Sequence, residues 1–171
     1  MSLLTSLSDY IPFTFVFRNW PSTDFQSPDT IAYDVVSKIL LADTPRELRK
    51  QLKEELRGVD YNKAMAQATL HYLQDAIKAR TQMSRAAANA LTKAKDAAVD
   101  ISGENPVYVT LVTLGVLAVF APCVLEALGF GGLGPMKGSF AAVWHRTYAA
   151  HVAKRTLSIY LHKMRLAGKM T

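Results

Sequence analysis

The feature that most constrains the fold is a run of twenty residues, 106–125, without a single charged side chain. A helix of this length extends about 30 Å at 1.5 Å per residue, which matches the hydrocarbon core of a bilayer. Tyr108 near one end suits a membrane interface, Pro122 predicts a kink near the other end, and Glu126 follows directly. We predict a helix over 106–128 that is transmembrane or fully buried in protein. We favour the transmembrane alternative, because the other predicted helices offer mostly half-apolar faces to cover it.

Two helices are predicted in the first part of the chain. Apolar residues recur at helical spacing over 29–41 and predict the first helix. Thr44 is a fitting N-cap for the second helix, because Pro45 follows at the first helical position and Glu47 stands three residues after the cap. This helix would end at Gly58, since glycine commonly follows the last helical turn.

A long third helix is predicted over 60–99, where seven alanines lie between positions 86 and 98. Alanine favours a helix but buries little area, so we expect close helix–helix packing, within the chain or against a partner chain. His71 and Asp75 stand four residues apart and face each other on such a helix. Because two ligands do not make a metal site, we interpret the pair as a surface hydrogen bond and expect neither a metal nor a cofactor.

Residues 1–28 combine aromatic residues with prolines, and we interpret them as an apolar arm that docks on another surface. The alternation in FTFVF permits a short extended segment, although a single strand has no partner in this chain. The alternative is a loop that covers a helical core. The stretch lacks the basic region of a signal peptide, and its first basic residue is Arg18, which argues against a transit peptide.

Positive charge is concentrated in the last third of the chain. Residues 1–106 hold thirteen Lys/Arg and thirteen Asp/Glu, whereas 107–171 hold seven Lys/Arg and one acid, Glu126. This asymmetry predicts contact with anionic lipid, nucleic acid or an acidic partner, and the alternative is a solvated basic tail. Cys123 is the only cysteine, so no internal disulfide forms, and we interpret it as a small packed residue.

A glycine-rich segment, GFGGLGPMKGS, separates the apolar run from the basic end. Gly134, Gly138 and Ala142 are spaced by four, and on one helix they would form a stripe of small residues that packs membrane helices. With Gly129 they make up a predicted helix-packing set. A plain flexible turn accounts for the glycines equally well, because glycine turns without a Cβ penalty.

The run LGFGGLGPMKGSFAA resembles the interferon-induced 6-16 family, small apolar proteins related to interferon alpha-inducible protein 27. The resemblance covers about residues 110–168. The matching residues are Gly129, Phe130, Gly134, Gly138, Ser139, Ala141 and Ala142, followed by weaker matches at Val152, Ala153, Leu157 and Leu161. The resemblance implies a non-enzymatic protein of an organellar, often mitochondrial, membrane, with a role in stress response, innate defence or cell-death control.

The chain departs from that family in residues 138–168, which are basic where the family is apolar. A spanning helix would carry Arg146 and Lys154 deep into the bilayer, at about 2.5–3.5 kcal/mol each. We therefore expect 138–168 to lie at an interface as a basic helix, or to pack into a protein complex. The residues expected to contact anionic lipid or an acidic partner are Lys137, Arg146, Lys154, Arg155, Lys163, Arg165 and Trp144.

The predicted fold is all-α, with an arm at 1–28, a helical region at 29–101 and a membrane-associated region at 106–171. The last region consists of one hydrophobic, transmembrane helix, a glycine-rich hinge and a basic C-terminal helix. Lys/Arg lie close to the end of the span that leads into this basic helix, which places the C-terminus on the cytoplasmic or matrix side.

Three functions fit these features. The first is a small membrane protein without catalytic activity in a mitochondrial membrane. The second is a structural accessory subunit of a large mitochondrial membrane complex, because an arm and an alanine-rich helix suit a protein that lies along larger subunits or a second copy. The third, nucleic-acid binding through 137–169, is the weakest, since no recognised motif accompanies the basic residues. We do not expect an enzyme, because the chain has no GxSxG, P-loop or HExxH motif and no GxGxxG after a strand.

Overall fold

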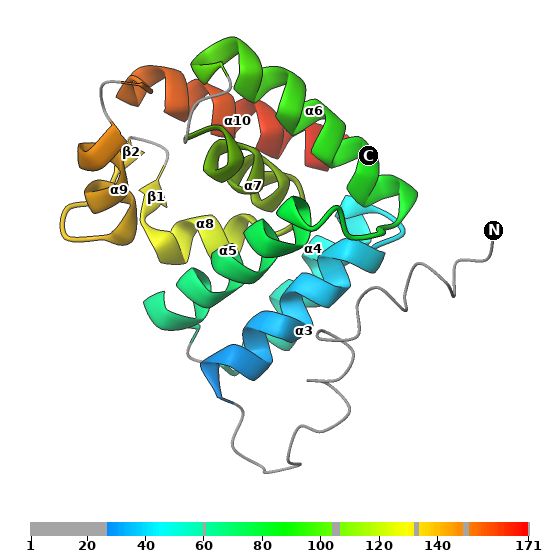
Figure 1. Cartoon of the computed structure of the whole chain (residues 1–171). Helices are drawn as coiled ribbons and strands as arrows, with labels where there is room; N and C mark the ends of the chain where they lie inside the picture. The colour runs from blue at the N-terminus through cyan, green and yellow to red at the C-terminus, as the bar shows by residue number, and fades with distance from the viewer. Residues whose placement is uncertain (1–26, 60, 104–106, 132–133, 149–150, 171) are drawn as a thin grey trace.

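Helix α7 (Val107–Phe120) lies at the centre of the fold, and most of the other helices pack on it (Figure 1). The structure is a computed structural model that describes residues 27–59, 61–103, 107–131, 134–148 and 151–170. The described part is mostly helical, which confirms the predicted all-α class. The predicted arm at 1–28 lies outside the described residues except for its last two positions.

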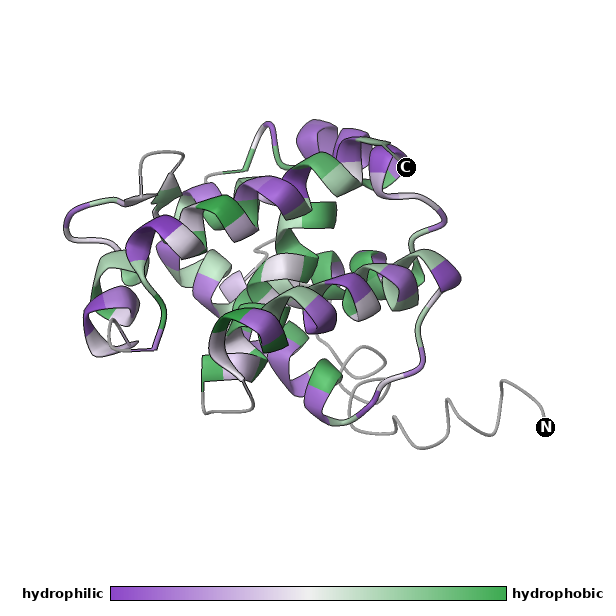
Figure 2. Cartoon of the chain, turned by 90° about the horizontal axis from the view of Figure 1, so that it is seen from above, coloured by the Kyte–Doolittle hydropathy of each residue, from purple (hydrophilic) through white to green (hydrophobic). Residues whose placement is uncertain are grey.

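Helix α7 is central because it has no polar face to turn toward water. Every residue from Leu111 to Phe120 is buried, and Thr113 satisfies its hydroxyl by donating to the carbonyl of Val109 at 2.8 Å. Figure 2 shows the hydrophobic residues gathered toward the middle of the bundle and the hydrophilic ones on its outer turns. The structure therefore has the apolar run as a buried core helix. None of the described helices combines the length and the hydropathy that crossing a membrane requires.

The apolar run forms two helices and not one, because Pro122 interrupts it. Proline lacks an amide hydrogen and disfavours the helical conformation of the preceding residue. Ala121 accordingly adopts φ −141° and ψ 65°, and Pro122 begins helix α8 (Pro122–Leu128). The kink predicted at Pro122 is a complete break in the structure.

Helices α3 (Pro28–Leu41) and α4 (Pro45–Glu55) form as the sequence predicts. The Ser27 hydroxyl accepts a hydrogen bond from the amide of Thr30, at 3.3 Å, and caps α3. Thr44 caps α4 by accepting from the amide of Glu47 at 3.2 Å. Both helices have proline in their first turn, where the missing amide hydrogen would have no partner in any case.

The single helix predicted over 60–99 is wrong. The chain forms two helices, α5 (Lys63–Lys78) and α6 (Arg85–Ser102). Between them Arg80 takes a left-handed φ of 55°, and Ser84 caps the new helix by accepting from the amide of Ala87 at 3.1 Å. Residues 79–84 contain no glycine or proline, so this break has little local signal in the sequence.

The alanines of α6 pack within the chain. Ala87, Ala90, Ala94 and Ala98 are buried on the face that α6 turns toward α7. Because alanine side chains are short, the two helix axes approach closely. This confirms close helix–helix packing in α6 and identifies α7 as its partner.

The glycine-rich segment forms a small antiparallel turn. Strand β1 (Phe130–Gly131) pairs with β2 (Gly134–Pro135), and helices α9 (Phe140–Tyr148) and α10 (Lys154–Met170) follow. Gly129 ends α8 with φ +95°, and a Cβ there would overlap the side chain of Ser139.

The predicted helix-packing set therefore does not lie on one helix. Gly129 ends α8, Gly134 lies in β2, Gly138 lies in the turn before α9, and only Ala142 is helical. The three glycines all have positive φ angles, which is the turn alternative that the sequence left open.

Candidate functional site

The strongest functional feature is a surface on α9, α10 and the turn before α9, which we name the C-terminal surface. Most of the large hydrophobic side chains that the described residues expose lie here, and outside it only Leu41 and Val99 are of this kind. Those of the C-terminal surface are Met136, Val143, Ile159, Leu166 and Met170. Exposed aliphatic side chains concentrated in one segment are typical of an interaction surface.

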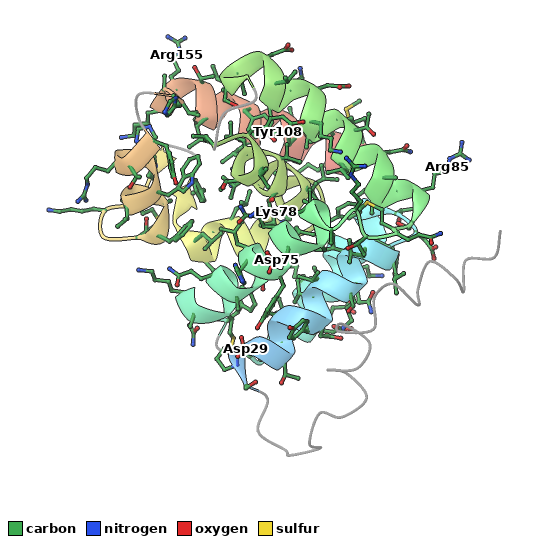
Figure 3. All side chains as sticks on the ribbon, viewed as in Figure 1. Asp29, Asp75, Lys78, Arg85, Tyr108 and Arg155 are labelled. Carbon is green, nitrogen blue, oxygen red and sulfur yellow. The ribbon has the colours of Figure 1, made fainter. Side chains whose placement is uncertain are left out.

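Helix α10 is amphipathic, and its outer face combines apolar with basic side chains. The inner face packs on α7 through Leu157, Tyr160, Leu161, Met164 and Gly168. Ile159, Lys163 and Leu166 recur at helical spacing on the outer face, where Ile159 exposes 58% of its surface. Figure 3 shows Arg155 extending away from the bundle at the start of α10.

Five of the basic residues predicted to contact lipid or an acidic partner are exposed on the C-terminal surface. These are Lys137, Arg146, Lys154, Arg155 and Lys163. Arg165 is half-buried and donates to the main-chain carbonyl of Phe130 at 2.9 Å, so its guanidinium also holds β1 against α10.

Trp144 is not on the surface, although the sequence placed it among the contact residues. It exposes only 7% of its surface and packs edge-on against Phe130, with ring centroids 6.0 Å apart. It lies on the inner face of α9, three residues after Ala141, which is also buried. Trp144 therefore anchors α9 to the bundle and does not reach a membrane from this position.

The positive charge of the C-terminal surface has no acidic neighbours in sequence, because no Asp or Glu follows Glu126. Among the described residues, ion pairs join Lys38 to Asp34 and to Glu55, and His71 to Asp75. None of them involves α9 or α10, so the cations of the C-terminal surface remain available to an anionic partner.

Arg49 of α4 is a structural residue that the sequence analysis missed. Its Nε donates to the carbonyl of Val119 at 2.7 Å, and its Nη2 donates to the carbonyls of Ala118 and Arg165 at 2.7 and 2.9 Å. The carbonyls at the end of α7 have no helical partners and carry partial negative charge. Burial, together with the nearby Arg165, lowers the pKa of the Arg49 guanidinium. One side chain thus fastens α4 and α10 to the end of the central helix.

Gly168 makes this junction possible. A Cβ at that position would overlap the carbonyl of Val119 and the guanidinium of Arg49. In the sequence, the only sign of the role of Arg49 is its position between Leu48 and Leu52, which lie on the inner face of α4.

No group of three or more His, Cys, Asp or Glu side chains comes together as a potential metal site within the described ranges. No protein-family model matches the chain, and neither a curated protein nor a solved structure matches it. The resemblance to the interferon-induced 6-16 family therefore stays a prediction.

Proposed function

We propose that the protein is a small non-enzymatic membrane-associated protein that binds an anionic lipid surface through its C-terminal surface. The observation that carries this proposal is the combination of exposed cations and exposed aliphatic side chains on α9 and α10, without any acid. Each Lys or Arg close to an anionic leaflet contributes about 1 kcal/mol. Aliphatic side chains such as Ile159 and Leu166 add to this by entering the interfacial region.

The geometry favours α10 lying along the leaflet. Its inner face is occupied by α7, and only the outer face with Ile159, Lys163 and Leu166 is free to meet lipid. Such a helix binds in the plane of the interface, with its cations at the headgroups.

The resemblance of residues 110–168 to the interferon-induced 6-16 family supports a mitochondrial membrane and a role in stress response, innate defence or cell-death control. A structural accessory subunit of a large mitochondrial membrane complex is the second candidate. The exposed Val143, Ile159 and Met170 favour it, because side chains of this kind also pack against another protein subunit.

Vesicle flotation of the full chain tests the lipid proposal. Vesicles of phosphatidylcholine alone should leave the protein behind, whereas mixtures with phosphatidylserine or cardiolipin should carry it upward. Binding should weaken as salt is raised, because salt screens exposed charges. Absence of binding to all three vesicle types would rule out the lipid surface, and migration of the native protein at the mass of a large complex would then favour the subunit.

A further inference from the structure

A second site lies on a different part of the fold, in a groove between α4 and α8 that we name the α4–α8 groove. Its volume is about 640 Å³. Its walls come from the second half of α4, the chain before α5, and the junction of α7 with α8. The groove is lined by Arg49, Leu52, Lys53, Leu56, Arg57, Tyr61, Phe120, Ala121, Pro122, Cys123, Glu126 and Ala127.

The interior of the groove is apolar. Phe120 and Ala121 are buried at its base, where α7 ends. Leu56, Tyr61 and Cys123 are half-buried and present their remaining surface to the groove. An apolar lining with a few polar groups at its edge is typical of a small-molecule site.

The charges of the groove are unequal on its two walls. Lys53 is exposed near the end of α4, and Arg57 is exposed in the turn that follows this helix. Both side chains line the groove. Neither takes part in an ion pair among the described residues. Arg49 lies nearby, but it is engaged with the carbonyls at the end of α7. The opposite wall contributes one carboxylate, Glu126, so an anionic group is attracted to the α4 side.

We propose that the α4–α8 groove binds a monomeric long-chain fatty acid. The carboxylate pairs with Lys53 and Arg57, since arginine matches a carboxylate with two parallel hydrogen bonds. The hydrocarbon chain lies against Leu56, Tyr61 and Cys123. This proposal does not depend on membrane binding, because the groove lies on α4 and α8 and shares no exposed cation with the C-terminal surface.

The size of the groove favours this ligand over a helix of a partner protein. Small-molecule pockets measure about 300–1,000 Å³, and the groove falls within that range. A stable protein interface buries about 800 Å² of surface on each partner. Such an area extends well beyond the walls of a pocket of this size.

Cys123 provides a direct test, because it lines the groove and is the only cysteine in the chain. Burial raises the pKa of the Cys123 thiol, so alkylation is slow at neutral pH and is best followed in a mildly alkaline buffer. Palmitate, below the concentration at which it forms micelles and without vesicles, should slow alkylation of the full chain severalfold and saturably. It should also raise the midpoint of thermal unfolding, as any ligand of the folded state does.

The double variant Lys53→Gln/Arg57→Gln should lose this protection and keep the alkylation rate that it shows without palmitate. Lys50→Gln removes a charge from the exposed face of the same helix, outside the groove, and should keep the protection. Hexadecanol, which has the same chain without the carboxylate, should protect only weakly.

Three results would overturn the proposal: an alkylation rate that palmitate does not change, equal protection in the double variant, or protection by vesicles alone. Failure here would leave vesicle binding by the C-terminal surface intact, so the two proposals fail separately.

Discussion

The hydroxyl of Tyr160 on α10 donates a hydrogen bond of 2.7 Å to the main-chain carbonyl of Leu111 on α7. Gly115 lies one turn further along α7, and a Cβ at this position would overlap that hydroxyl and come within 3.0 Å of the Ala94 side chain on α6. Three helices therefore meet at a single glycine in the most apolar part of the molecule. Burial raises the pKa of the Tyr160 hydroxyl, which keeps it protonated as a donor.

Gly115→Ala should destabilise the protein, although alanine is normally the better helix former by roughly 0.5–1 kcal/mol. The added methyl group has no space between Tyr160 and Ala94, and overpacking of this kind costs about 1–3 kcal/mol. Urea unfolding should show a lower midpoint with an unchanged slope. Gly58→Ala is the matched control, because a Cβ at Gly58 meets nothing within 4 Å. Equal midpoints for Gly115→Ala and the wild type would disprove the tight junction.

Tyr160→Phe should cost about 1 kcal/mol by itself, since it leaves the Leu111 carbonyl without this donor. In the Gly115→Ala background the same change should cost less or even stabilise, because it removes the atom that the new methyl group overlaps. A double-mutant cycle in urea measures this coupling. Strictly additive free energies would show that the two positions do not share one space.

Arg49→Met should destabilise the protein by roughly 2–4 kcal/mol. The variant keeps the length of the side chain but leaves the partly buried carbonyls of Ala118, Val119 and Arg165 without their donor, at about 1–3 kcal/mol for a buried unpaired group. Arg49→Lys should lose part of the stabilisation that Arg49 provides, since an ammonium lacks the planar fork of the guanidinium. Lys50→Met, on the exposed face of the same helix, should change the midpoint of thermal unfolding little. A similar small change in Arg49→Met would contradict the anchoring role.

The helices of the first part were predictable because their boundaries are set by local chemistry. Thr44 and Pro45 define the start of α4 whatever surrounds them, and the apolar spacing over 29–41 defines α3. The break at Arg80 has no glycine or proline to signal it, although Arg80 takes a left-handed φ of 55°. The apolar run 106–125 predicts a helix, but it does not predict whether lipid or protein surrounds that helix. A run without charges fits a bilayer and a protein core equally well, and the choice depends on how the other helices assemble.

The C-terminal surface was predictable only in outline. The excess of basic residues is visible in the sequence, but the division between exposed Arg155 and half-buried Arg165 depends on how α10 is rotated against α7. Trp144 illustrates the limit, because aromatic residues suit a membrane interface and a protein core alike. Arg49 and the α4–α8 groove depend on contacts between segments more than sixty residues apart, which helical spacing does not reveal.

Glu55→Gln should weaken the protein slightly at neutral pH and change its response to acid. Glu55 accepts a hydrogen bond from the Lys38 ammonium, which lowers the pKa of the Glu55 carboxyl below its ordinary 4.5. The ion pair thus stabilises the wild type above about pH 4.5, and this contribution is lost as the pH falls through the lowered value. Because the pair is exposed, its contribution is about 0.2–1 kcal/mol.

Thermal unfolding between neutral and acid pH measures this difference. The gap between the wild type and Glu55→Gln should close as the pH falls, whereas Glu54→Gln, exposed on the same helix, should follow the wild type throughout. A gap that stays constant down to the lowest pH would show that Glu55 acts by something other than its charge.

The C-terminal surface makes a paired prediction about lipid binding. Lys163→Glu replaces an exposed cation on the outer face of α10 by an anion, and each charge near an anionic leaflet is worth about 1 kcal/mol. Affinity for vesicles that contain phosphatidylserine should therefore fall about tenfold or more. Lys63→Glu makes the same change in net charge at the exposed start of α5, which is not part of the C-terminal surface, and should leave the affinity nearly unchanged. Ile159→Ser separates the apolar contribution from the electrostatic one, since it should weaken binding equally at low and high salt, whereas the effect of Lys163→Glu should shrink as salt rises. Equal losses in Lys163→Glu and Lys63→Glu would mean that lipid responds to net charge alone, and the C-terminal surface would then have no special role.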